Sequence, residues 1–249
     1  MTTLSLSRNP GELHGPRRPT KEAARHWRTE LLLLTATFAL CAFYYIARAD
    51  LVGTRGPGGA WTAVTAPARS PSLHFGAAAL LLGLVPLAAA RWGCGISFRD
   101  LGLGLGNRRA GLRWLAVGLP AAILAGWIAS GSPAMRAVYP LDPSVVGAPL
   151  SFVPHALRNL LYFGAWEVLF RGVLLFGLRE TIGSGGANST QTGLSVAAHF
   201  GRPMTETFAA IPAGLAFGAI ALQTKSIWYV TLIHWSVGTS MDWFIVAGA

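Results

Sequence analysis

Glu167 and Arg171 stand inside an apolar stretch that begins near Phe152 and continues to Leu178. The stretch is typical of a membrane-spanning helix, and placing either charge at bilayer depth costs roughly 2.5–3.5 kcal/mol. The two residues are four positions apart, so they lie one turn from each other on the same face of a helix. Such a pair indicates a functional site, although a mutually neutralising structural pair explains this stretch equally well.

Two histidines, His199 and His234, follow in later helical segments. A single histidine in an apolar helix is more often a packed, hydrogen-bonded residue, but here three helices could bring a carboxylate and two imidazoles together. A carboxylate in a low-dielectric site can act as a base toward water, and the imidazoles can share that role or stabilise an oxyanion. The same three groups could ligate zinc, but there is no His-Glu-x-x-His helix and no cysteine nearby, so we expect no metal and no other cofactor.

The composition places the chain among polytopic helical membrane proteins, because 52% of its 249 residues are hydrophobic and 12% are charged. The fold class we expect is therefore an all-α transmembrane bundle. The net charge is +10, but the basic residues lie mostly between apolar runs, where they report topology and headgroup contact rather than nucleic acid binding. The two cysteines, Cys41 and Cys94, show no disulfide or metal signature.

The apolar runs predict about seven membrane spans. We expect residues 1–29 to form a flexible basic cytoplasmic tail and residues 30–249 to form the transmembrane domain. Residues 101–106 and 181–192 are expected to be loops, and Gly214 and Gly218 are spaced for close helix contact. The expected helices are 30–47, 73–92, 112–130, 152–178, a short one from about 193 to 203 that need not cross, 208–222 and 227–246.

The distribution of lysine and arginine predicts the orientation of the bundle. The N-terminal cluster, the basic residues between Arg91 and Arg113, Arg179 and Lys225 fall on one side if the spans alternate. The positive-inside rule then places the N-terminus in the cytoplasm and the C-terminus on the opposite face.

The order of these motifs resembles the CPBP family of intramembrane proteases, which includes type II CAAX endopeptidases, bacteriocin-processing proteins and Abi-type proteins. The family's first motif is Glu-Glu-x-x-x-Arg, and the chain has Trp166-Glu167-x-x-x-Arg171 at that place. The second motif, Phe-x-x-x-His, corresponds to the segment that ends at His199. The family's later Gly-x-x-x-Gly, Thr-x-Ser-Ile and histidine-bearing segments correspond to Gly214 with Gly218, residues 224–227, and His234.

The resemblance covers a protease-like core at about 152–246, and it implies a glutamic-type endopeptidase of the bacterial inner membrane. Its partners would be the lipid bilayer and a membrane-associated protein or peptide, which it would cleave. The resemblance also implies site roles: Glu167 would activate a water with His199, His234 would stabilise the oxyanion, and Arg171 would hold Glu167 ionised and oriented. We expect Glu167 and His199 to be the closest pair among the three catalytic candidates.

Two departures from the family pattern affect this reading: Trp166 replaces the first glutamate, and Gly238 replaces the asparagine of His-x-x-x-Asn. The segments after His199 and His234 resemble a bacterial branch with a single motif-one glutamate. We therefore keep Glu206 and Asp242 as secondary site candidates, although interfacial carboxylates near span ends explain them equally well.

The direction of Trp166 separates two interpretations. In a decayed site Trp166 would fill the cavity where water should lie. In a rearranged site, which we expect, Trp166 would point to lipid or pack behind the site, and Glu167 alone would face the histidines. The alternative functions are an inactive relative that acts as a scaffold, immunity or substrate-binding factor, and, ranked last because no inverted repeat is visible, a small transporter with Glu167 as proton relay.

Overall fold

The computed structural model of the chain describes residues 21–47, 54–55, 61–62 and 71–248. These residues form a helical bundle, so the all-α prediction is confirmed. The described part also holds one minimal antiparallel ladder, between β1 (Thr54–Arg55) and β2 (Trp61–Thr62). Helix α1 (Lys21–Ala47) begins well before residue 30, so the end of the expected tail is helical, whereas residues 1–20 lie outside the described residues.

The helices follow the predicted apolar runs closely. The rod at 71–93 alternates between α-helical and wider π-helical turns, and the rod that begins at 152 changes from α-helix to π-helix after Glu167. Short helices connect α4 to α6. The elements are α2 (Pro71–Ala77), η2 (Ala78–Leu84), α3 (Val85–Ala88), η3 (Ala89–Gly93), α4 (Arg108–Ser130), α5 (Pro133–Arg136), η4 (Pro143–Val145), η5 (Pro149–Ser151), α6 (Phe152–Glu167), η6 (Val168–Phe176), α7 (Gly177–Ala198), α8 (Met204–Thr224) and α9 (Trp228–Val246).

Five segments of the described residues are long and apolar enough to cross a membrane. The segment at 152–198 counts once, although non-helical torsion angles at Gly183 divide it into two rods. Helix α9 falls outside the five because its sequence carries several polar side chains. It is sheltered instead by protein, since α4, α6 and α8 all pack against it. The five segments are 25–46, 71–93, 108–130, 152–198 and 204–224.

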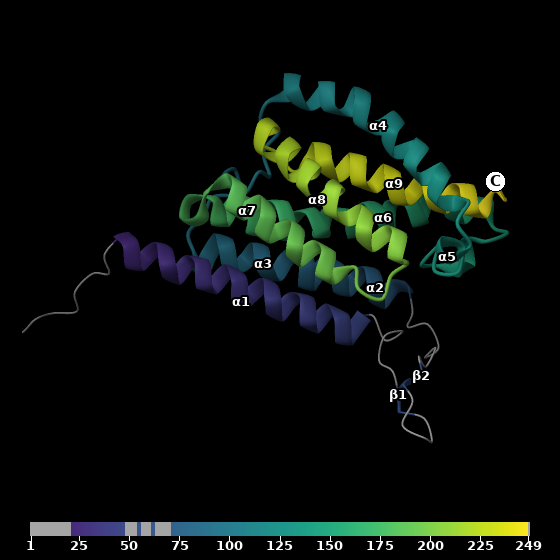
Figure 1. Cartoon of the computed structure of the whole chain (residues 1–249), viewed down its shortest axis with the longest axis horizontal. Helices are drawn as coiled ribbons and strands as arrows, with labels where there is room; N and C mark the ends of the chain where they lie inside the picture. The colour runs from purple at the N-terminus through teal and green to yellow at the C-terminus, as the bar shows by residue number, and fades with distance from the viewer. Residues whose placement is uncertain (1–20, 48–53, 56–60, 63–70, 249) are drawn as a thin grey trace, which may run out of the picture.

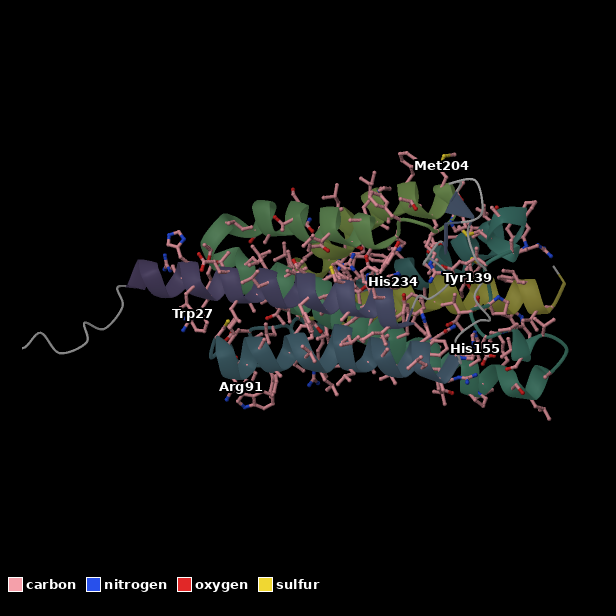
Figure 2. All side chains as sticks on the ribbon, turned by 90° about the horizontal axis from the view of Figure 1, so that it is seen from below. Trp27, Arg91, Tyr139, His155, Met204 and His234 are labelled. Atoms are coloured by element: carbon pink, nitrogen blue, oxygen red, sulfur yellow. The ribbon has the colours of Figure 1, made fainter. Side chains whose placement is uncertain are left out.

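The bundle is elongated, and its two ends carry different residues. Helix α1 begins at the left end and α9 ends at the right end (Figure 1). Figure 2 shows Trp27 and Arg91 at one end and Tyr139, His155 and Met204 at the other. The start of α1 and the end of α9 therefore lie at opposite ends of the bundle.

The π-helix η6 forms the centre of the core. All of its residues, including Arg171, are buried, and the helices around it are α1, α3, α6, α7 and α8. A helix buried on every side reads as a continuous apolar run, which is the pattern that surrounds Glu167 and Arg171 in the sequence.

The expected loop at 181–192 is wrong, because α7 runs through it and only Gly183 departs from helical geometry. Its polar residues are held by α8: the Gln191 side-chain amide donates to the Gly214 carbonyl at 3.0 Å, and the Asn188 amide donates to the Leu215 carbonyl at 3.1 Å. A Cβ on Gly214 would meet the Thr192 side chain at 2.8 Å, which confirms the predicted close helix contact there. Packing between helices thus overrides the low helix propensity of this segment.

The glycine-rich segment at 101–106 is a loop, as predicted, and it holds the beginning of α9. The Ile227 amide donates to the Gly102 carbonyl at 2.9 Å, and the Tyr229 hydroxyl donates to the Leu105 carbonyl at 2.9 Å. The backbone at Gly102 has φ +76°, a conformation that glycine adopts without strain. The loop therefore fixes the helix that carries His234.

The long contact between α4 and α9 depends on glycines. A Cβ on Gly126 would lie 2.1 Å from the Ser240 hydroxyl and 2.8 Å from two backbone atoms of α9. The backbone of a packed helix cannot yield easily to such an overlap.

We predict that Gly126→Ala lowers the free energy of unfolding by about 1–3 kcal/mol, because the added methyl overpacks this interface. The matched control is Gly193→Ala, whose Cβ would meet no atom within 4 Å; it is expected to raise stability by about 0.5–1 kcal/mol. Denaturant titration of the detergent-solubilised chain, followed by circular dichroism, measures both. Equal stability of the two variants would contradict the tight contact.

Candidate active site

A cavity of about 830 Å³ opens among the helices in the half of the bundle that contains Tyr139. Its wall is mostly apolar, and its volume is typical of clefts that enclose a ligand, which span roughly 300–1,000 Å³. Side chains with titratable or amide groups border it from α1, α6, α8, α9 and the segments after α5 and α7. They are Cys41, Tyr44, Tyr45, Tyr139, Asn159, Tyr162, His199, Arg202, Glu206, His234 and Asp242.

Glu167 lies behind this cavity rather than in its wall. Its side chain is completely buried, and its Oε1 accepts a hydrogen bond from Arg171 Nη1 at 3.0 Å. The same oxygen lies 2.7 Å from His234 Nδ1. Because a carboxylate accepts, Nδ1 carries the hydrogen in this contact, and the imidazole is fixed with its other nitrogen available. Glu167 therefore meets the cavity through His234.

Arg171 completes the charge balance of this buried group. Only 1% of the residue is exposed, and its guanidinium lies over the Phe217 ring at 5.5 Å from the centroid. The π-helix that contains it begins directly after Glu167. Single π-helical turns inside helices occur frequently at functional sites, where they re-aim side chains. The predicted Glu167–Arg171 pair is present, and it is joined by His234.

His199 lies at the end of α7, away from Glu167. Its Nδ1 is 2.7 Å from the Ser195 carbonyl oxygen, and its Nε2 is 3.9 Å from Glu206 Oε1. The expectation that Glu167 and His199 form the closest pair is therefore wrong: the nearest imidazole to Glu167 is that of His234. The two histidines border the same cavity but have different carboxylate partners.

Trp166 borders the cavity and is 5% exposed. Its ring lies 5.2 Å from that of His199 in an edge-to-face arrangement and 4.7 Å from that of Phe170. The expectation that Trp166 points to lipid or packs behind the site is wrong. The residues beside it, Ala165 and Glu167, are buried as well, so α6 has no lipid-facing side at this level. Trp166 faces the cavity while Glu167 faces α9.

Glu206, in the first turn of α8, is the carboxylate beside His199. Its Oε1 accepts a hydrogen bond from the Tyr139 hydroxyl at 2.8 Å, and the Arg202 guanidinium lies over the Tyr139 ring at 5.4 Å. Burial raises the pKa of Tyr139 well above its usual value, and the carboxylate of Glu206 adds to this effect. Tyr139 therefore keeps its proton and acts as a donor.

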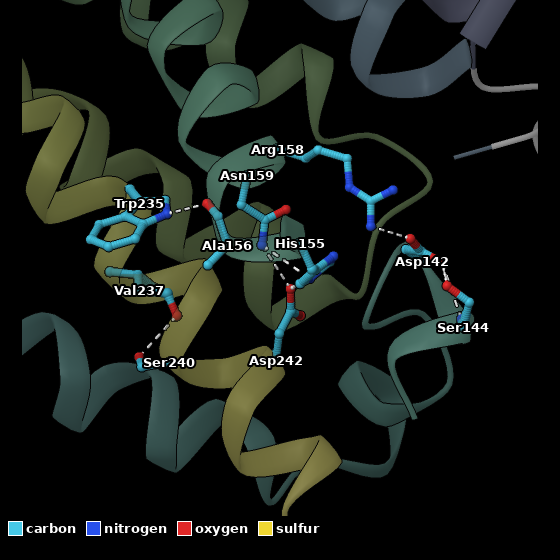
Figure 3. Close-up of polar contacts among 10 residues, drawn as sticks. All are labelled: Asp142, Ser144, His155, Ala156, Arg158, Asn159, Trp235, Val237, Ser240 and Asp242. Carbon is cyan, nitrogen blue, oxygen red and sulfur yellow. Dashed lines mark hydrogen bonds and ion pairs between the residues drawn. The ribbon is translucent and has the colours of Figure 1, made fainter. Parts of the chain in front are cut away.

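Asp242 forms a second buried cluster at the edge of the cavity (Figure 3). Its Oδ2 lies 2.8 Å from His155 Nε2 and accepts a hydrogen bond from the Asn159 amide at 3.0 Å. Sequence reasoning missed His155 and Asn159, although a signal was present. His155 and Asn159 begin a series with a spacing of four that continues with Phe163 and ends at Glu167. This spacing places all of them along one face of α6.

The loop between α5 and α6 is tied to the same helix. The Arg158 guanidinium donates to Asp142 Oδ2 at 2.6 Å, and Ser144 donates to Oδ1 of the same carboxylate (Figure 3). Although burial alone would raise the pKa of Asp142, the hydrogen bonds from Ser144 and the charge of Arg158 lower it. This contact keeps the segment that carries Tyr139 near the cavity.

Phe163 explains why position 238 has no side chain. A Cβ on Gly238 would lie 2.5 Å from the Phe163 ring, and that ring lies 4.5 Å from the His234 ring. The space beside His234 that an asparagine would need is thus filled from α6. The loss of this asparagine is accompanied by an aromatic contact that holds the same imidazole.

Comparison with known proteins gives one family match. Residues 149–239 match the family model described as type II CAAX prenyl endopeptidase Rce1-like. This segment contains Glu167, Arg171, His199 and His234 and excludes Asp242. Neither the curated proteins nor the solved structures include a significant match to the chain. Together with the five apolar segments, the family match identifies a multi-pass membrane protein.

We predict that Arg171→Leu lowers the free energy of unfolding by about 3–5 kcal/mol, because it removes one partner of a buried ion pair. The double variant Glu167→Leu with Arg171→Leu is expected to lose less, since no unpaired charge remains. Glu180→Gln is the control, because Glu180 is exposed on α7. Denaturant titration in detergent compares them, and a double variant less stable than Arg171→Leu would contradict the pairing.

Proposed function

We propose that the chain is an intramembrane endopeptidase, because its residues 149–239 match the family model of Rce1-like type II CAAX prenyl endopeptidases. Its substrate would be a membrane-associated protein or peptide, cleaved by an activated water. The observation that carries the proposal is that His199 and His234 border one cavity of peptide-segment size, each with a carboxylate at its ring.

The geometry supports specific roles for the two histidines. His234 would present Nε2 to the scissile carbonyl and stabilise the oxyanion, while Glu167 holds the opposite nitrogen and therefore acts as a positioning residue. His199 would take part in moving protons between water and the leaving amine. Arg171 would keep Glu167 ionised inside the core. The proposed residues are those expected from the sequence, but the role of Glu167 differs: it would orient His234 instead of activating the water.

The charge distribution supports an orientation for the cavity. Arg91, in η3, lies at the end of the bundle opposite to Tyr139 (Figure 2). The loop before α4, with Arg99, and the loop between α8 and α9, with Lys225, lie at the same end (Figure 1), and basic segments between spans face the cytoplasm. We propose a bacterial inner-membrane location with the N-terminus in the cytoplasm. The cavity then opens in the outer half of the membrane, and a substrate is cut on the side away from the cytoplasm.

We predict that the purified chain, reconstituted in liposomes with a mass-encoded library of single-span peptides that carry short polar tails, cleaves a subset of them. His199→Ala and His234→Ala are each expected to lower the cleavage rate by at least ~100-fold, the lower range for a general acid–base group. Mass spectrometry of the products gives the rates and the cut positions.

The matched control is His26→Ala, because His26 is exposed on α1 and precedes Trp27, which lies at the end of the bundle opposite to Tyr139 (Figure 2). Its rate should equal that of the parent. If the parent cleaves nothing while library peptides protect it from thermal unfolding, the chain is a substrate-binding relative without catalysis, and the peptidase proposal is wrong.

We predict that a membrane-impermeant thiol reagent added to intact spheroplasts labels Leu150→Cys and leaves Leu105→Cys unlabelled until the membrane is permeabilised. Both residues are exposed. Leu105 lies in the loop before α4 and Leu150 in η5 between α5 and α6, and the start of α4 and the region of α5 lie at opposite ends of the bundle (Figure 1). The background carries Cys41→Ser and Cys94→Ser, so each variant has a single thiol. The reverse labelling pattern would place the cavity on the cytoplasmic side.

A further inference from the structure

We propose that Glu206 is the carboxylate that activates the attacking water, together with His199, so that this chain carries its catalytic carboxylate on α8 instead of α6. The inference rests on the peptidase function proposed above and assigns a residue to its first chemical step. It is argued from two observations: the exposure of the carboxylates near the cavity, and the position of Glu206 beside the His199 ring.

Three buried or partly buried carboxylates lie near the cavity, and they differ in access. The Glu167 side chain has no exposed surface and is bound by Arg171 and His234. The Asp242 side chain is 5% exposed and is bound by His155 and Asn159. The Glu206 side chain is 21% exposed and borders the cavity. Glu206 thus has the most exposed side chain of the three carboxylates, although its Oε2 is buried.

The His199 ring is oriented so that its reactive nitrogen meets Glu206. Nδ1 lies 2.7 Å from the Ser195 carbonyl, and a carbonyl oxygen only accepts, so Nδ1 carries the hydrogen. In the neutral ring Nε2 is then the nitrogen that carries the lone pair, and it lies 3.9 Å from Glu206 Oε1. A proton acceptor on each residue therefore faces the same part of the cavity.

Tyr139 and the end of α8 hold Glu206 in this position. The Tyr139 hydroxyl donates to Oε1 at 2.8 Å, and the Glu206 amide donates to the Pro203 carbonyl at 3.0 Å. Glu206 lies in the first turn of α8, where the partial positive charge of a helix N-terminus attracts a carboxylate. A purely structural role for Glu206 would be to stabilise this helix end, and the experiment below separates the two roles.

The proposed step balances without any further reactant. One water gives a proton to the Glu206 carboxylate, and its oxygen forms a bond to the carbonyl carbon of the peptide. The carbonyl oxygen becomes an oxyanion held by His234. The proton then passes through His199 to the amide nitrogen, the C–N bond breaks, and the products are a carboxylate and an amine after normal ionisation. Glu206 and His199 return to their starting state.

Trp166 offers a second place from which a carboxylate could reach the same ring. Its side chain contacts His199 from α6, with 5.2 Å between the ring centroids. Replacing Trp166 by glutamate would shorten the side chain, open the cavity and place a carboxylate on another side of His199. This allows a test by exchange, in which the carboxylate is removed from α8 and supplied from α6.

The experiment compares Glu206→Gln with the parent in the liposome library assay and by ¹⁵N NMR of histidine-labelled full-length chain in detergent. Glutamine keeps the shape and an oxygen for the Tyr139 hydrogen bond, so the fold should persist. We expect cleavage by Glu206→Gln to fall by at least ~100-fold in kcat with KM unchanged. Adding Trp166→Glu should restore part of the rate, and Glu180→Gln should cleave like the parent.

The NMR measurement tests, without any substrate, whether His199 is paired with Glu206 and His234 with Glu167. The His199 Nε2 resonance should change in Glu206→Gln and not in Glu167→Gln, whereas the His234 Nδ1 resonance should show the opposite dependence. Helix-end stabilisation alone would lower thermal stability and leave kcat at the parent value, which overturns the inference while the peptidase stands. If the parent cleaves nothing, the proposed function fails and the catalytic role falls with it. An unchanged His199 resonance in Glu206→Gln would also overturn the pairing itself.

Discussion

A charged carboxylate in the centre of an apolar bundle has to be compensated, and this requirement shapes the rest of the site. Glu167 is completely buried, and its Oε1 is bound by Arg171 from the next turn and by His234 from α9. Breaking such a pair leaves an uncompensated charge, so α6, η6 and α9 are fixed relative to one another. The imidazole of His234 is oriented as a consequence, with one nitrogen toward the core and the other toward the cavity.

This constraint also separates the site into two halves. In the half behind the cavity, the buried Glu167 and Arg171 form an ion pair, and Arg171 also contacts the Phe217 ring, which borders the cavity. The half that borders the cavity contains His199, Glu206 and Tyr139, whose side chains are reached by solvent or lie at its wall. Orientation and charge stabilisation can therefore come from one half, and proton transfer with water from the other.

The sequence predicted the helices and the buried pair better than it predicted the directions of the side chains. Apolar runs located the spans because burial and lipid contact select the same residue types. The polar part of α7 was missed because Asn188 and Gln191 obtain their hydrogen bonds from α8, which no local pattern reveals. The direction of Trp166 was predicted wrongly. Neighbouring residues differ by about 100° around a helix, so we expected Trp166 to point away from the site that Glu167 faces, which assumed a lipid-facing side of α6 at this level. Val153, Leu157 and Leu161 do form an exposed apolar stripe on α6. At the level of Trp166 no such side remains, since Ala165, Trp166 and Glu167 are all buried.

The two imidazoles that border the cavity come from α9 and from the end of α7, whose sequences are poorly suited to lipid. Helix α9 carries Ser236, Thr239 and Asp242 as buried polar residues, and the second part of α7 carries Gln191, Thr192 and Ser195. Polar side chains at this depth need protein partners or a polar cavity, because lipid offers no hydrogen bonds. The stronger apolar helices α1, α4 and α8 surround these two and provide that shelter. The cavity therefore borders the two segments whose polar residues need such shelter. The residues that made these spans hardest to recognise are the residues that would carry the proposed chemistry inside the membrane.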